Sequence, residues 1–114
     1  MDIKSSCIGF NPTYSEEAPS FEPGGQLVGT TIIEFGAPWC EHCQAATLAI
    51  REELTKHSNV THIKLSDGKG KILGRKFKVK LWPTLILLKN GQEINRLIRP
   101  LCASEINQLL TKSL

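Results

Sequence analysis

Residues Thr30–Cys43 have the sequence TTIIEFGAPWCEHC, and this stretch decides the fold of the chain. Its first seven residues are rich in β-branched side chains and end at Gly36, which is typical of a strand. Pro38 then interrupts the strand, because proline lacks the N–H that a sheet ladder needs. The stretch therefore predicts a strand that ends just before a pair of cysteines.

The residues that follow favour a helix over 40–57. Ala46, Ile50 and Leu54 recur every four residues, which predicts one buried stripe along this helix. Asn59 lies where the pattern ends. The first cysteine is therefore expected at the N-terminus of a helix, directly after a strand.

The same kinds of pattern predict the remaining elements on either side of residues 30–57. They are a short strand near 7–10, a short helix or turn around 15–18, a strand over 60–65, a short basic helix over 68–77, a strand over 84–88, a hairpin turn at 90–91, a strand over 93–98 and a helix over 103–114. A strand–helix–strand unit implies a parallel pair with a right-handed crossover, and the hairpin adds antiparallel strands. We expect an α/β fold, with a central mixed sheet of four to five strands flanked by helices.

The chain has 114 residues, of which 40% are hydrophobic, and a formal net charge of +3. This length and composition predict a single domain. Residues 1–29 are rich in glycine, proline and acidic residues, so we expect a lead-in packed on a domain over 30–114. The longest apolar run, 85–88, is far shorter than the roughly 20 residues of a membrane span. The N-terminus lacks the apolar segment of a secretory signal, so we expect a cytoplasmic protein if Met1 is the true start.

The cysteine pair carries the chemistry. Backbone N–H groups and the helix dipole at Cys40 favour a thiolate, and only a thiolate attacks a disulfide. Cys43 lies one turn further on, where it can close a ring with Cys40. We therefore expect Cys40 to be the nucleophile and Cys43 the resolving thiol. The alternatives are a pair of small buried side chains or half of a zinc site, but a structural zinc ion needs four ligands and no second such pair exists.

Three segments of this sequence resemble the thioredoxins. Glu34–Cys43 is similar to their active-site segment, Leu81-Trp82-Pro83-Thr84 to their cis-proline loop, and Lys89-Asn90-Gly91 to the hairpin turn that follows. The similarity runs from about Thr30 to Leu114. It implies a thioredoxin-like fold and thiol–disulfide exchange, with no cofactor or metal beyond the Cys40–Cys43 disulfide.

The resemblance also implies roles for individual residues. Glu34 stands where the family has a buried acid that takes the proton of Cys43, and Lys64 stands beside it. The residues expected to contact substrate are Trp39, Trp82, Pro83, Thr84 and Arg99.

Several positions depart from the family pattern. Glu41-His42 replaces the common Gly-Pro, so that His42 makes the disulfide more oxidising while Glu41 opposes it. Gly36 stands where many thioredoxins have a second tryptophan. Trp82 and Arg99 are larger than the usual residues, which predicts a narrow groove that favours acidic partners.

Other reactive or charged residues are expected to be structural. Cys7 and Cys102 should lie toward opposite sheet edges and remain unpaired. His57 and His62 have no partner in the sequence pattern, and we interpret them as ordinary surface or core residues. Seven of the fourteen basic residues lie between Lys64 and Lys80, which we interpret as a solvated face rather than a nucleic-acid site.

Three functions remain open from the sequence. The first is a protein disulfide reductase, a monomer served by a thioredoxin-reductase-like or other thiol electron donor. The second is an adaptor module with a redox-sensitive cysteine pair. The third, suggested by His42, is a disulfide oxidant or isomerase.

Overall fold

The computed structural model describes residues 6–8, 11, 14, 29–57, 59–68 and 72–112. Five strands and three helices lie in these ranges. In chain order they are β1 (Ser6–Ile8), β2 (Thr30–Gly36), α1 (Glu41–Leu54), β3 (Val60–Ser66), α2 (Ile72–Lys76), β4 (Thr84–Lys89), β5 (Gln92–Ile98) and α3 (Ala103–Lys112). The expected α/β class, with a mixed sheet flanked by helices, is confirmed.

The sheet has the strand order β1-β3-β2-β4-β5, which places β2 at its centre. β2 pairs parallel with β3 and antiparallel with β4, so that Glu34 lies between Lys64 and Leu85. β1 and β5 form opposite edges, as expected. The side chain of Cys7 lies outside the described residues, whereas Cys102 is exposed and carries a free thiol.

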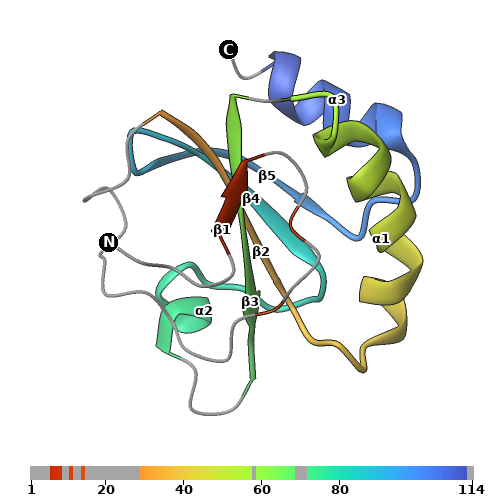
Figure 1. The fold of residues 1–114 in the computed structure, drawn as a ribbon. Coiled ribbons are helices and arrows are strands. Elements are labelled where there is room, and N and C mark those ends of the chain that lie inside the picture. The colour runs from red at the N-terminus through yellow and green to blue at the C-terminus, as the bar shows by residue number, and fades with distance from the viewer. Residues whose placement is uncertain are drawn as a thin grey trace.

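Helices cover both faces of the sheet (Figure 1). Side chains alternate along β2, so Ile32 packs with α1 and α3 while Phe35 packs against Phe77 beside α2. Glu34 points to the same face as Ile32 and is only 1% exposed. The family resemblance predicts this burial, whereas the strand pattern alone allows an exposed position.

Within the expected helix over 68–77 the structure describes α2 at Ile72–Lys76, and residues 69–71 lie outside the described residues. Gly68 has a φ of +145° and Lys78 a φ of +58°, and neither angle belongs to a right-handed helix. The turn at Asn90-Gly91 has positive φ at both residues, as a tight hairpin requires. The expected turn at 15–18 lies outside the described residues.

Glu53 of α1 links this helix to α3, and both helices cover the sheet face that carries Ile32. Its Oε2 accepts hydrogen bonds from Asn107 of α3 at 3.0 Å and from His57 at 2.7 Å. Burial alone would raise the pKa of Glu53, but these bonds and nearby Lys56 lower it on balance. His57 therefore has a partner, and the expectation that it has none is wrong.

We expect Glu53→Ala to lower the free energy of unfolding by about 1–3 kcal/mol at pH 7, because two partly buried donors lose their acceptor. Glu52→Ala, at an exposed position of the same helix, should change it by less than about 0.5 kcal/mol. Because the folded state lowers the pKa of Glu53, its ionic contribution is present above the ordinary carboxyl range and is lost as the pH falls through the folded pKa. Urea unfolding at pH 7 and pH 3 measures both effects, and equal losses in the two variants would contradict this account.

Candidate active site

Cys40 is the N-cap residue of α1, so the helix begins at Glu41, one residue later than expected. The Cys40 sulfur accepts a hydrogen bond from the backbone N–H of Cys43 at 3.3 Å. Cys40 is 7% exposed and Cys43 only 1%, and both are free thiols. The more accessible sulfur therefore lies where helix N–H groups favour an anion.

Cys43 lies in a different environment. Burial, followed by its hydrogen bond with Cys40, raises the pKa of Cys43 to about 12, and a hydrogen bond with Tyr14 partly opposes this rise. Cys43 is therefore a neutral thiol near pH 7. It needs a base before it can act as a nucleophile.

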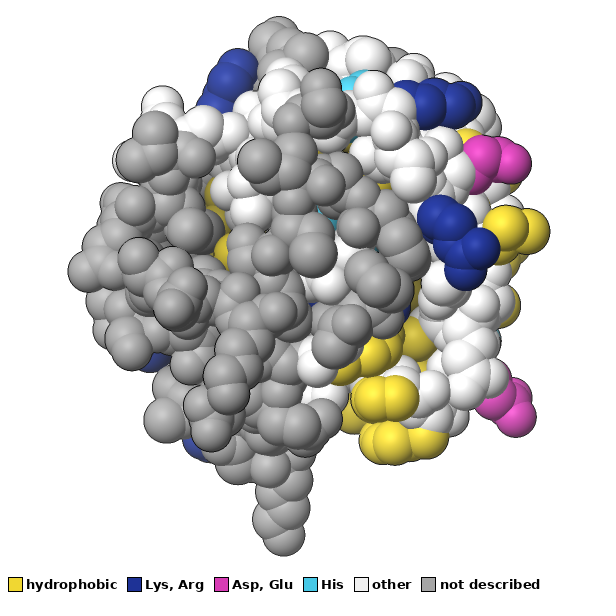
Figure 2. Space-filling view, viewed as in Figure 1, with side chains coloured by type: hydrophobic (Ala, Val, Ile, Leu, Met, Phe, Trp, Pro, Cys, Tyr) yellow, Lys and Arg dark blue, Asp and Glu magenta, His cyan; other side chains and the backbone are white. Residues whose placement is uncertain are grey.

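Two tryptophans line the rim of the cysteine pair. Trp39 is 72% exposed and contacts Trp82 edge-on, with ring centroids 5.5 Å apart. Trp82 packs against Cys40 and Cys43, and its indole N–H donates to Asp67 at 2.9 Å. Figure 2 shows hydrophobic side chains gathered at the end of the molecule where β2 leads into α1.

The loop before β4 has the expected cis peptide bond between Trp82 and Pro83. Thr84 is buried, and its hydroxyl donates to the carbonyl of Leu81. Two hydrogen bonds hold Arg99 against this loop. Its Nε donates to the Trp82 carbonyl at 2.8 Å, and its backbone N–H donates to the Pro83 carbonyl at 2.9 Å. The sequence does not predict these contacts.

A buried polar cluster, formed by Asn11, Tyr14, Glu34, His62 and Lys64, lies behind Cys43. His62 Nε2 lies 2.9 Å from Glu34 Oε1, and the Tyr14 hydroxyl donates to Glu34 Oε2 at 3.4 Å. The backbone N–H of Asn11 donates to His62 Nδ1 at 2.8 Å. Lys64 Nζ lies 4.4 Å from the centre of the Tyr14 ring. Glu34 and Lys64 are directly paired across β2 and β3, as the resemblance implies.

Three members of this cluster are not predicted as site residues from the sequence, namely Asn11, Tyr14 and His62. The sequence pattern shows no partner for His62 and allows a core position; the structure buries it, and parallel pairing puts it on the same face as Glu34. Tyr14 comes from the proline-rich lead-in, where no periodicity marks it. Gly36 explains how Tyr14 fits: a Cβ there would lie 2.6 Å from the Cys43 sulfur and 2.9 Å from the Tyr14 hydroxyl.

The other charged residues are spread over the surface. Glu41 and His42 are exposed on the first turn of α1. Lys64 is buried, so the stretch from Lys64 to Lys80 is not one continuous basic face. Within the described residues no group of three or more His, Cys, Asp or Glu side chains could hold a metal ion. No helix among those residues is long and apolar enough to cross a membrane.

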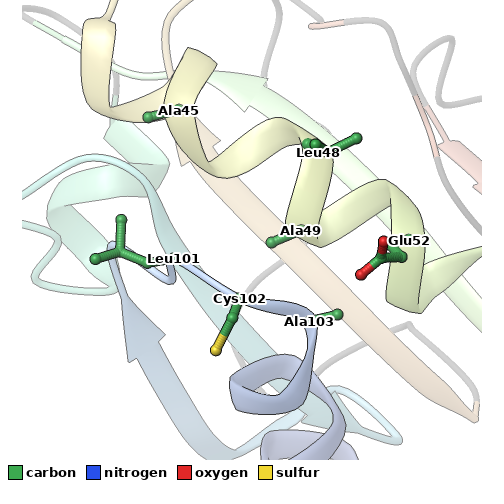
Figure 3. Close-up of a pocket in the computed structure, with 7 residues that line it drawn as sticks. All are labelled: Ala45, Leu48, Ala49, Glu52, Leu101, Cys102 and Ala103. Atoms are coloured by element: carbon green, nitrogen blue, oxygen red, sulfur yellow. The ribbon is translucent and has the colours of Figure 1, made fainter.

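A pocket lies away from the cysteine pair, between α1 and the segment that leads into α3 (Figure 3). It has a volume of about 230 Å³, and Leu48, Leu101 and Cys102 are among its lining residues. The Cys102 sulfur lies 3.1 Å from the Ser104 hydroxyl. None of the predicted site residues lines this pocket.

Known proteins share both the sequence pattern and the fold. Residues 25–112 match the family model described as Thioredoxin. Thioredoxin H5 of Arabidopsis thaliana is 31% identical over 81 residues, which cover 71% of this chain and 68% of that protein. Thioredoxin H-type of Fagopyrum esculentum is 28% identical over 85 residues, covering 75% and 71%. The structure of thioredoxin 2 from Pseudomonas aeruginosa PAO1 in its reduced form has a TM-score of 0.77 at 43% identity, covering 88% of this chain and 93% of that one.

The chain therefore belongs to the thioredoxin family. Thioredoxins are thiol–disulfide oxidoreductases that use no cofactor, and with its Cys40–Cys43 pair this chain is a protein-disulfide oxidoreductase as well. For the family as a whole, the substrates are protein disulfides and the electron donor is a reductase.

We expect Cys40 to be alkylated faster than Cys43 near neutral pH. The comparison uses Cys40→Ser and Cys43→Ser variants in which Cys7 and Cys102 are also serine, and iodoacetamide rates from pH 6 to pH 10. The chain with Cys43 alone should react slowly at pH 7 and speed up throughout the range, since burial raises the pKa of the Cys43 thiol even without the Cys40 thiol. Faster reaction of that chain at pH 7 would contradict the assignment, and equal rates in denaturant serve as the control.

Proposed function

We propose that this chain reduces disulfides in partner proteins, with Cys40 as the nucleophile and Cys43 as the resolving thiol. The observation that carries the proposal is the unequal environment of the two sulfurs. Cys40 caps a helix and is 7% exposed, whereas Cys43 is 1% exposed and has a raised pKa. A pair of equivalent buried thiols would not divide the reaction in this way.

The reaction has two steps. The Cys40 thiolate attacks a substrate disulfide, so that a bond between Cys40 and one substrate sulfur forms and the other substrate sulfur leaves as a thiolate. Glu34 then accepts the proton of Cys43, and the Cys43 thiolate attacks the Cys40 sulfur. The Cys40–Cys43 bond forms and the second substrate sulfur is released. Two electrons pass to the substrate, and an external thiol donor such as a thioredoxin reductase restores the dithiol.

The substrate strand docks on the rim formed by Trp39, Trp82, Pro83, Thr84 and Arg99. Trp82 and Trp39 supply an apolar surface, and Arg99 adds a positive charge held at the loop. This arrangement favours partners with acidic residues near the disulfide. Lys64 positions the polar cluster behind Cys43. Glu41 and His42 shift the reduction potential of the Cys40–Cys43 disulfide in opposite directions.

The proposal extends to the setting of the protein. A reducing dithiol fits the cytoplasm, where thiols are kept reduced. We propose that the chain acts there as a monomer on protein partners, with residues 1–29 packed on the domain. The contacts of Asn11 and Tyr14 with the sheet support that packing. Nucleic acid, membrane and metal have no part in this proposal.

We expect the parent to accelerate insulin reduction by dithiothreitol, and Cys40→Ser to fall to the rate of dithiothreitol alone. Cys43→Ser should also lose turnover but accumulate a mixed disulfide with the substrate, because the first step remains possible. Turbidity measures turnover and non-reducing mass spectrometry detects the adduct. A parent that only binds insulin, with no gain in rate, would instead indicate an adaptor.

We expect Trp82→Ile and Arg99→Gly together to raise kcat/KM for reduction by a thioredoxin reductase by about tenfold, near 1.4 kcal/mol. The first widens the groove, and the second removes a charge at a residue whose φ of +52° glycine adopts readily. Lys78→Gly is the matched control, since Lys78 is also a cation with positive φ, at +58°. A parent as fast as a typical thioredoxin would show that the groove is not restrictive.

A further inference from the structure

We propose that Tyr14 is a catalytic residue that carries the proton of Cys43 to Glu34 when Cys43 attacks the mixed disulfide. The inference rests on the proposed function and adds a residue to it. It concerns only the second step, in which a buried thiol must become a thiolate.

The Tyr14 hydroxyl lies between the donor and the acceptor of this proton. It donates to Glu34 Oε2 at 3.4 Å, and when the O–H turns the other way it donates to the Cys43 sulfur. The space beside Gly36 shows how closely these groups meet, because one added Cβ would lie within 3 Å of both the thiol sulfur and the hydroxyl oxygen, at 2.6 and 2.9 Å. Among the described residues, the side-chain hydrogen bonds of Glu34 go to Tyr14 and His62, so the hydroxyl is the group that connects the carboxylate to the thiol.

His62 determines which carboxylate oxygen takes the proton. The backbone N–H of Asn11 donates to His62 Nδ1, so this nitrogen has no proton and the ring proton is on Nε2. His62 Nε2–H then donates to Glu34 Oε1. Oε1 is thereby held, and Oε2 is left facing Tyr14 as the acceptor.

Tyr14 can relay a proton without becoming charged. Burial, followed by the negative charge of Glu34, raises the pKa of Tyr14 far above its ordinary value. The hydroxyl therefore accepts a proton from Cys43 only as it releases its own to Glu34. A short chain of donors and acceptors in a partly buried site favours such a transfer.

In the reduced protein the Cys43 S–H donates to the Cys40 sulfur. In the mixed disulfide, where Cys40 is bonded to the substrate, the Cys43 S–H turns to donate to the Tyr14 oxygen, and the Tyr14 O–H donates to Glu34 Oε2. Both protons shift along the chain, which leaves a Cys43 thiolate, a neutral tyrosine and a protonated Glu34. The thiolate attacks Cys40, the Cys40–Cys43 bond forms, the bond from Cys40 to the substrate breaks, and its electron pair leaves with the substrate sulfur.

The test separates the two steps with dithionitrobenzoate, in a chain whose Cys7 and Cys102 are serine. Attack by Cys40 releases one thionitrobenzoate anion, and attack by Cys43 on the resulting mixed disulfide releases a second. Stopped-flow absorbance from pH 6 to pH 10 resolves the two phases. The groups that face the relay are Glu34 of β2, His62 and Lys64 of β3, and Cys40 and Cys43 at the start of α1.

Tyr14→Phe keeps the ring and removes only the hydroxyl. We expect it to slow the second phase at least about tenfold at pH 7, with the first phase within about twofold of the parent. The deficit should shrink toward pH 10, where hydroxide supplies another route for the proton. Gly36→Ala, which forces the thiol and hydroxyl apart, should slow the same phase.

Thr47→Val is the matched control. It removes a hydroxyl that donates to the Cys43 carbonyl at 2.8 Å but does not contact the sulfur. Both of its phases should stay within about twofold of the parent. Glu34→Gln should slow the second phase, and adding Tyr14→Phe to it should cause little further loss, because the two residues act in one chain.

A second phase of Tyr14→Phe within twofold of the parent would overturn the inference, as would an equal slowing of both phases, which indicates a structural role. Either result leaves the proposed function intact. Failure of the parent itself to release a second thionitrobenzoate would instead overturn the proposed function.

Discussion

The carboxylate of Glu34 lies in the central strand of the sheet, and its burial governs the arrangement around it. A buried charge costs several kcal/mol unless hydrogen bonds satisfy it, so the fold must bring donors to this point. His62 provides one donor from β3 and Tyr14 provides another from the N-terminal segment. An apolar side chain would fill the same position at less cost, which argues that the charge serves chemistry rather than stability.

The two cysteines are close in sequence but differ in environment. The sharp turn after β2 puts Cys40 at the start of α1, where its sulfur accepts a backbone N–H. One turn later Cys43 faces the sheet and the polar cluster, where burial raises its pKa to about 12. Gly36 leaves room for the Tyr14 hydroxyl beside this thiol. In the proposed mechanism one sulfur attacks a partner, while the other stays protonated until the cluster takes its proton.

The sequence predicts those strands and helices whose formation depends on residues close together in the chain. The β-branched run of β2 and the fourfold spacing of Ala46, Ile50 and Leu54 correctly predict a strand and a helix, and the position of Cys40 follows from their junction. The positive φ values of Gly68 and Lys78, on either side of α2, are not predicted, because composition does not reveal backbone angles.

The polar cluster illustrates what local patterns miss. The contact of Glu34 with His62 joins residues 28 apart, and its contact with Tyr14 joins residues 20 apart. The first depends on the parallel register of β2 and β3, and alternation within both strands indicates that the two side chains share a face. The second depends on the path of a proline-rich segment that has no periodicity. No sequence signal places Tyr14 beside Cys43.

The reduction potential of the Cys40–Cys43 couple tests the account most directly. A strong oxidant needs a reduced form that is stabilised as a Cys40 thiolate, and among the described residues the groups that donate to the Cys40 sulfur are the backbone N–H and the thiol of Cys43, neither of which carries a charge. Equilibration in glutathione and dithiothreitol redox buffers, with the two oxidation states counted by alkylation and mass spectrometry, gives the value. The account predicts a potential near about −270 mV, the range of a reductant, and a value near about −120 mV would contradict it.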